Sequence, residues 1–269
     1  MNNLRPIGIF DSGMGGLTVV KEVMRTLPQE KIIYFGDTAR VPYGPKSKET
    51  VVRFSIENIL FLLKHNVKMI IIACNTASSV ALSIVQENFK VPVMGVITPG
   101  VKKALSITKN NRIGVIGTKT TIKSKSYEKQ ILKISKNTKI YSNACPLFVP
   151  LVEEGWLNRP ITKIIAQEYL SPFKKKKIDT MILGCTHYPL LKPVIKDVLG
   201  TGVVLVDSAK EVAQGAKQIL VKENLLATKQ KSKINNISFY VSDEPENFSH
   251  LGQKFLGFAL NNVKKVNHV

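Results

Sequence analysis

Residues 69–76 have the sequence Met-Ile-Ile-Ile-Ala-Cys-Asn-Thr, an apolar run that ends in polar side chains. A short continuous run of β-branched residues predicts a strand that is covered on both faces, as in a parallel sheet. Similar apolar runs predict further strands at 7–10, 32–35 and 91–96, and helices are expected between them at about 17–27, 47–63 and 77–89. Buried strands that alternate with helices predict an α/β fold with a mainly parallel sheet.

The helix expected after Ser47 has a clear start and an apolar side. Serine is a favoured N-cap residue because its hydroxyl accepts a hydrogen bond from the first turn. Apolar residues three and four positions apart predict one buried face. The residues on that face are Val52, Ile56, Ile59, Leu60 and Leu63.

The same order of elements then begins again. Residues 113–118 resemble residues 7–12, with an offset of 113 − 7 = 106. Residues 181–187 resemble residues 69–76, and their cysteines are 185 − 74 = 111 positions apart. Any two buried strands look alike, so chance similarity is the alternative. The matched order and the matched cysteine favour a duplication that produced two related α/β units, 1–97 and 98–207.

The remaining residues, 208–269, carry signals for a helix at 209–224, a strand at 237–241 and a helix at 248–261. This segment is too short to bury a core of its own. We therefore expect it to pack onto the first unit, so that the first domain consists of 1–97 plus 208–269 and the second of 98–207.

Composition limits the class of protein. The chain has 269 residues, of which 44% are hydrophobic and 22% charged, close to the averages for globular domains. It contains no apolar run of the ~18 residues that a membrane span needs. Its first residues lack the apolar core of a secretory signal, and three cysteines do not make a disulfide framework. These features predict a cytoplasmic protein with reduced thiols.

The chain is strongly basic. Lysine and arginine exceed aspartate and glutamate by 39 − 19 = 20, with basic runs at 174–177 and 228–233. Such runs favour either binding to nucleic acid or a solvated lysine-rich surface. No helix-turn-helix, zinc-finger or basic-zipper signature accompanies them. We therefore expect a solvated surface, and we do not expect nucleic acid as the main partner.

Four reactive side chains directly follow predicted strands: Asp11, Asp37, Cys74 and Cys185. Ligands of open parallel sheets bind outside the carboxyl ends of the strands. Asn75-Thr76 and Thr186-His187, which follow the two cysteines, offer hydrogen-bond donors that suit a carboxylate.

Other interpretations of these motifs are weaker. The glycine-rich turn at 11–16 lacks both the dinucleotide fingerprint and the P-loop lysine. Cys185 and His187 have no accompanying C-x-x-C pair, so a metal site is not indicated. Cys145 is interpreted as a small buried hydrophobe. Asp11 alone is compatible with a helix cap, and Glu153-Glu154 alone with surface charge.

Two thiols, one from each half of a duplicated fold, suit the inversion of a stereocentre. One thiolate would remove a proton from a carbon acid, and the other thiol would return a proton to the opposite face. Cysteine has a pKa near 8.5 that neighbouring groups can tune, and Asp11 and His187 are placed to be such neighbours.

Five segments in the same order resemble the cofactor-independent aspartate/glutamate racemase superfamily, and within it the glutamate racemases. They are residues 9–18, 36–44, 73–78, 149–155 and 184–191. The resemblance implies that Cys74 and Cys185 are the catalytic acid/base thiols. Asp11 would assist Cys74, and Glu153 with His187 would assist Cys185. The resemblance also implies a set of substrate-binding residues, namely Asp11, Ser12, Tyr43, Gly44, Asn75, Thr76, Thr186 and His187.

The resemblance further implies two pseudo-symmetric three-layer α/β/α domains, with the active site in the cleft between them. It implies conversion of L-glutamate to D-glutamate for peptidoglycan, hence for cell-wall biogenesis and cell shape. Cys185 would face L-glutamate and Cys74 D-glutamate. No pyridoxal phosphate, metal or nucleotide would be needed, and a homodimer is expected. Related racemases act on aspartate or hydantoins, and these substrates are the alternatives.

Overall fold

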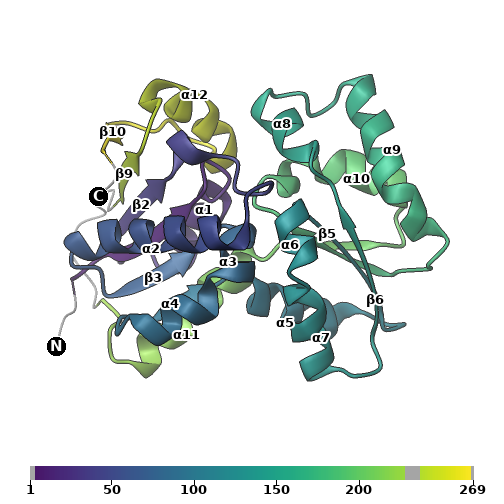
Figure 1. Ribbon diagram of the computed structural model, residues 1–269, viewed down its shortest axis with the longest axis horizontal. Helices are drawn as coiled ribbons and strands as arrows, with labels where there is room; N and C mark the ends of the chain where they lie inside the picture. The colour runs from purple at the N-terminus through teal and green to yellow at the C-terminus, as the bar shows by residue number, and fades with distance from the viewer. Residues whose placement is uncertain (1–3, 228–236, 268–269) are drawn as a thin grey trace.

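The computed structural model describes residues 4–227 and 237–267, and in this part of the chain the strands form two parallel sheets (Figure 1). The first sheet consists of β1 (Ile7–Asp11), β2 (Ile32–Gly36), β3 (Met69–Ile72), β4 (Val93–Gly95), β9 (Ile237–Val241) and β10 (Lys264–Lys265). The second consists of β5 (Arg112–Gly117), β6 (Lys139–Ala144), β7 (Thr180–Gly184) and β8 (Val204–Val206). The prediction of an α/β fold with parallel sheets is confirmed.

Helices cover both sheets. Those in the first half of the chain are α1 (Leu17–Thr26), α2 (Lys48–Lys64), α3 (Asn75–Val80), α4 (Leu82–Asn88), α5 (Ile97–Ile107), α6 (Lys119–Lys123) and α7 (Ser126–Ile134). Those in the second half are α8 (Phe148–Glu153), α9 (Pro160–Lys174), α10 (Lys192–Leu199), α11 (Ala209–Lys222) and α12 (Pro245–Leu256). Two short 3-10 turns, η1 (Thr38–Arg40) and η2 (Tyr188–Leu191), follow β2 and β7.

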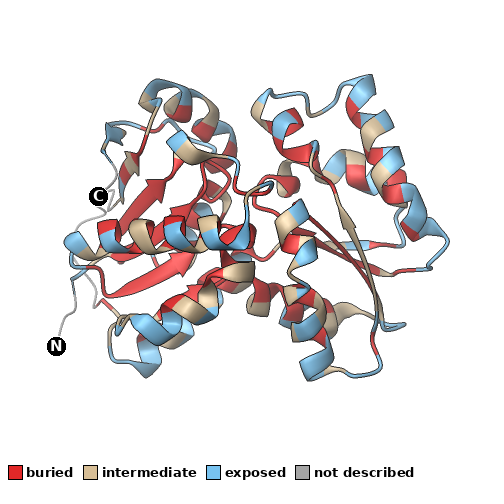
Figure 2. Cartoon of the chain, viewed as in Figure 1, coloured by how far each residue is buried: buried red, intermediate tan, exposed pale blue. Residues whose placement is uncertain are grey.

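Each sheet is the middle of three layers. In the first unit, α1, α11 and α12 share a core with one face of the sheet, and α2, α3 and α4 with the other. Successive strand residues alternate between the two cores, so that Ile9 joins the first and Phe10 the second. In the second unit, α8, α9 and α10 lie on one face and α5 and α7 on the other. Figure 2 shows the central strands of the first sheet buried on both sides.

The two units have the same strand order. β2-β1-β3-β4 in the first sheet corresponds position by position to β6-β5-β7-β8 in the second. Cys74 follows the third strand of the first unit, and Cys185 follows the third strand of the second. The repeat seen in the sequence is therefore also a repeat of topology.

The C-terminal segment lies on the first sheet. β9 pairs with β2, and α11 and α12 both contact α1. α12 was expected at 248–261 but spans 245–256, because Gly257 adopts φ +87° and ends the helix in the left-handed conformation. The basic run at 174–177 begins at the last residue of α9 and is exposed, whereas the run at 228–233 lies outside the described residues.

The buried face of α2 differs from the one predicted. Ser47 caps the helix as expected, its Oγ accepting from the Thr50 N–H. However, Leu60 is 41% exposed, and the fully buried side includes the polar residues Ser55 and Asn58. The pattern of apolar residues could not predict this face, because the polar Asn58 lies on it. Asn58 is buried where its side chain hydrogen-bonds to Tyr43, in the loop after β2.

The helix expected at 77–89 is divided at Ala81 into α3 and α4. Ser78 Oγ donates to the Ile72 carbonyl and accepts from the Val96 N–H, which ties α3 to the ends of two strands. Side-chain bonds to the backbone of this kind compete with a continuous helix. No helix within residues 4–227 and 237–267 is long and apolar enough to cross a membrane.

A buried ion pair fastens the chain after α11 to the first sheet. Lys68 Nζ lies 2.6 Å from Glu30 Oε2, and both side chains are almost wholly buried. Lys68 also donates to the Leu225 carbonyl, and Glu30 accepts from the Ala227 N–H. The pair therefore holds together three separate parts of the chain.

Replacing Lys68 with alanine will lower the free energy of unfolding by about 3–5 kcal/mol, because the Glu30 carboxylate is left buried without its cation. Urea unfolding measures the loss. The matched control is Arg25→Ala, which breaks an Arg25–Glu22 pair on the surface and will cost less than about 1 kcal/mol. Equal losses in the two variants would contradict the assigned role of the buried pair.

Candidate active site

Cys74 lies between the end of β3 and the start of α3. Its Sγ accepts from the Ala77 N–H at 3.4 Å and lies 3.7 Å from Ser12 Oγ. Burial, and secondarily the negative charge of Asp11, raise the pKa of the Cys74 thiol to about 12. At neutral pH this sulfur therefore carries a proton that it can donate.

Cys185 follows β7 and belongs to a chain of three groups. Its Sγ lies 3.8 Å from His187 Nδ1, and His187 Nε2 lies 3.1 Å from Glu153 Oε1 at the end of α8. Burial alone lowers the pKa of His187, but the hydrogen bonds to Cys185 and Glu153 outweigh it and raise the pKa to about 10. An imidazolium therefore stands beside the Cys185 sulfur at neutral pH and stabilises negative charge there.

Asp11 connects the two units. Its carboxylate accepts from the Gly13 N–H at 3.0 Å and from Thr186 Oγ1, across the interface, at 3.3 Å. Burial raises the pKa of Asp11, and the charge on His187 opposes this shift. The Asp11 side chain thus accepts a hydrogen bond from Thr186, the residue after Cys185. The residue that contacts the Cys74 sulfur is Ser12. That Asp11 serves Cys74 stays a prediction.

The two thiols line one enclosed cavity. Nine of the predicted site residues line it, namely Ser12, Tyr43, Gly44, Cys74, Asn75, Thr76, Cys185, Thr186 and His187. Asp11 and Glu153 do not, but each makes a hydrogen bond to a residue that does. The parallel sheets bring these residues together from segments up to 175 positions apart.

Sequence reasoning missed four residues of the cavity wall: Val41, Pro42, Thr118 and Val149. Thr118 follows β5, and its hydroxyl lies 2.9 Å from that of Thr76 in the other unit. The repeat contained a signal for it, because the alignment of 113–118 with 7–12 pairs Thr118 with Ser12.

A buried polar network supports the wall at 41–44. The Tyr43 hydroxyl donates to Asp37 and accepts from Asn58 Nδ2, and neither of these two partners lines the cavity. Arg40 Nε donates to Asp37, and its Nη2 donates to Asn58 Oδ1. Asp37, which was predicted to follow a strand, therefore does not line the cavity. It accepts hydrogen bonds from Arg40 and from Tyr43, which does line it.

Cys145 lies outside this cavity, as its interpretation as a small buried hydrophobe requires. Burial raises its pKa well above the usual value for a thiol. In the described part of the chain no three His, Cys, Asp or Glu side chains are grouped so as to hold a metal ion.

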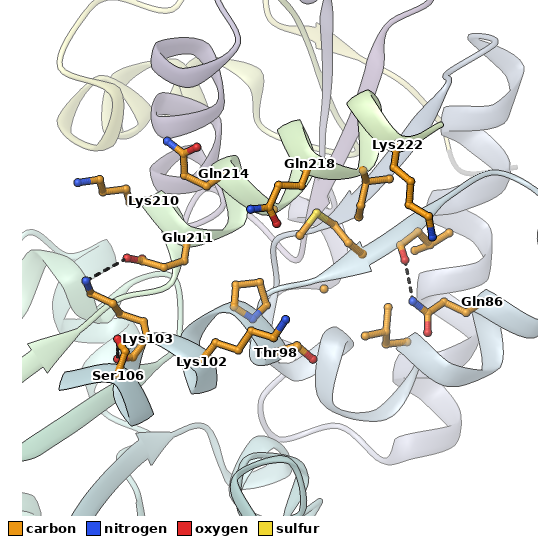
Figure 3. Close-up of a pocket in the computed structure, with 17 residues that line it drawn as sticks. Gln86, Thr98, Lys102, Lys103, Ser106, Lys210, Glu211, Gln214, Gln218 and Lys222 are labelled. Carbon is orange, nitrogen blue, oxygen red and sulfur yellow. Dashed lines mark hydrogen bonds and ion pairs between the residues drawn. The ribbon is translucent and has the colours of Figure 1, made fainter. Parts of the chain in front are cut away.

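A second cavity, of about 770 Å³, lies between α4, α5 and α11 (Figure 3). Several lysine and glutamine side chains surround it, and Lys103 pairs with Glu211 across it at 3.9 Å. None of the predicted site residues lines it. Size alone therefore does not select the candidate active site; the smaller cavity is chosen because both thiols line it.

Comparison with known proteins agrees with this geometry. Residues 12–216 match the family model Asp/Glu/Hydantoin racemase. The glutamate racemase of Geobacter metallireducens is 49% identical over 262 residues, which cover 97% of this chain and 96% of that protein. The crystal structure of glutamate racemase isoform RacE1 from Bacillus anthracis superposes with a TM-score of 0.94 at 40% identity, covering 98% of each chain.

The glutamate racemase of Francisella tularensis in complex with D-glutamate has a TM-score of 0.91 and 44% identity, again covering 98% of each chain. The fold, the paired cysteines and these matches show that the chain belongs to the Asp/Glu/hydantoin racemase family. The relative and the two solved structures named above match nearly the whole length of the chain, and all three are glutamate racemases.

Proposed function

We propose that the protein interconverts L- and D-glutamate, without a cofactor, by proton transfer at the α-carbon between Cys74 and Cys185. The observation that carries this proposal is the pair of thiols that line one cavity from equivalent positions of the two sheets. The choice of glutamate over aspartate or a hydantoin is supported by the nearly full-length similarity to glutamate racemases.

From L-glutamate, the Cys185 thiolate removes the α-proton, as the family resemblance implies. An S–H bond forms at Cys185 while the C–H bond breaks, and the electron pair spreads into the α-carboxylate. The Cys74 thiol then gives its proton to the opposite face, so one S–H bond breaks and a new C–H bond inverts the centre. The raised pKa of Cys74 supports its role as the donor in this direction.

Glu153 and His187 act behind Cys185. The hydrogen bond from His187 Nε2 to Glu153 orients the ring so that Nδ1 faces the sulfur. An imidazolium in that orientation stabilises the thiolate before it removes the proton. Burial is the main reason that the Cys74 sulfur stays protonated, and Asp11, fixed between Gly13 and Thr186, adds to this effect through its negative charge.

The cavity also offers donors for two carboxylates. Ser12, Asn75 and Thr76 line it with polar side chains. Thr186, whose hydroxyl already donates to Asp11, lines it as well, as do Tyr43 and Gly44. The volume open to the centre of a water molecule is about 20 Å³. This space holds roughly one water molecule. We infer that glutamate enters when the two units separate. We propose that 1–97 plus 208–269 and 98–207 move as the two domains.

The direct test is incubation of purified protein with L-glutamate, and separately with D-glutamate, followed by circular dichroism without added cofactor. Optical activity will decay to zero from both sides. In deuterated water, newly formed enantiomer will carry deuterium at the α-carbon from the start, while the remaining substrate keeps its protium. Racemisation of aspartate with no change in glutamate would move the protein to the aspartate branch. Protium in early product would exclude two separate bases.

The rate will depend on pH as a bell-shaped curve, because the reaction needs one thiolate and one thiol together. At high pH the rate will fall as pH passes through about 10, where His187 loses the proton that stabilises the Cys185 thiolate. Initial rates measured from pH 6 to 11 will show this limb. A rate that rises monotonically to pH 11 would contradict the assigned role of His187.

The cellular part of the proposal follows the family resemblance: the D-glutamate formed serves peptidoglycan synthesis in the cytoplasm. Depletion of the protein in growing cells, with and without added D-glutamate, tests this role. The expected homodimer is a separate prediction that sedimentation of the purified protein will check.

A further inference from the structure

A buried tyrosine from the second unit touches both cysteine-bearing loops. Tyr127 lies on α7, and its hydroxyl is 2.5 Å from Oδ1 of Asn75, the residue directly after Cys74. Its ring also packs near Gly184, the residue directly before Cys185: a Cβ atom built at Gly184 would lie 3.1 Å from Tyr127 Cε2. One side chain therefore links the two loops that carry the thiols.

The hydrogen bond also decides which way the Asn75 amide points. Tyr127 is 3% exposed, so its hydroxyl proton needs a protein acceptor. Asn75 Oδ1 is that acceptor, and rotating the amide by 180° would replace it with a donor. The amide nitrogen is therefore directed away from Tyr127, and Asn75 itself lines the cavity. A nitrogen so placed is a donor for a carboxylate oxygen.

We propose that Tyr127 is a positioning residue for glutamate: its hydroxyl orients the Asn75 amide so that the nitrogen donates to a carboxylate of the substrate. Tyr127 touches no substrate atom itself and acts through Asn75. The inference rests on the proposed function, since it assumes that the cavity receives glutamate. Because the hydroxyl comes from one unit and the amide from the other, the amide is oriented only when the units are together.

The test is the isosteric variant Tyr127→Phe in the full-length protein. We expect KM for glutamate to rise roughly 3- to 10-fold, the value of one hydrogen bond, with a smaller change in kcat. The matched control is Tyr169→Phe, which removes a hydroxyl that accepts from the Leu147 N–H; neither Tyr169 nor Leu147 lines the cavity. Its KM will stay at the wild-type value.

A double-mutant cycle separates positioning from general packing. In an Asn75→Ala background the hydroxyl has no amide to orient, so adding Tyr127→Phe will leave KM unchanged. An equal rise in KM in both backgrounds, or no rise in either, would overturn the inference. Dissociation constants for D-glutamate from titration calorimetry, measured with Cys74→Ser added to every variant so that D-glutamate is not turned over, will follow the same cycle. A wild-type protein that binds glutamate but does not racemise it would overturn the proposed function while leaving this cycle decisive.

Discussion

Replacing either Cys74 or Cys185 with serine will lower the rate of racemisation by more than about 10³-fold, because each half-reaction needs a thiol of tuned acidity and a serine hydroxyl is far less acidic. The loss will be the same whether the reaction starts from L- or D-glutamate, since a full turnover uses both groups. Cys145→Ser is the matched control: this third buried thiol lies outside the cavity, and its variant will keep its activity.

Each variant will nevertheless retain one half-reaction. A glutamate analogue with chloride at the β-carbon reports it, because loss of the α-proton to a thiolate expels chloride without any second proton transfer. Cys74→Ser, which keeps Cys185, will eliminate chloride from the L-analogue, and Cys185→Ser will do so from the D-analogue. Elimination from both enantiomers at equal rates in either variant would exclude the assignment of one thiol to each face.

Replacing Gly15 with alanine will lower kcat by about 100-fold, the scale expected when reacting groups shift by about 1 Å. A Cβ atom built at Gly15 would lie 2.3 Å from Thr186 Oγ1 and 2.6 Å from His187 Nδ1. His187 cannot move aside easily, because it is buried between Cys185 and Glu153. The methyl group will therefore displace the Cys185 loop from the first unit.

The control for this variant is Gly202→Ala, where a Cβ atom would meet nothing within 4 Å. Steady-state kinetics and thermal unfolding of both variants separate loss of geometry from loss of fold. Gly15→Ala with wild-type kcat and KM would show that the two units do not need to approach as closely as the structure has them.

Much of the fold was predictable because local signals and tertiary packing agree. Strands such as 69–72 are apolar throughout, and only a sheet buried on both faces gives every residue of such a strand a buried place. Helix α12 is a case where a local signal was overlooked. Gly257 marks the end of the helix, but the sequence prediction extended the helix to residue 261. The face of α2 could not be predicted, because Asn58 is buried by its partners Tyr43 and Arg40 and not by its own hydrophobicity.

For the candidate site, the sequence by itself singled out the two cysteines and the polar residues beside them, which the structure brings to one cavity. Both cysteines follow corresponding strands of a repeat, and the carboxyl ends of parallel strands are where ligands bind. Only the tertiary structure decided how those residues act on one another. The contacts of Asp11 with Thr186, of Tyr127 with Asn75 and of Gly15 with His187 all cross from one unit to the other. Such contacts follow from how the two units meet in space, and periodicity along the chain does not record that arrangement.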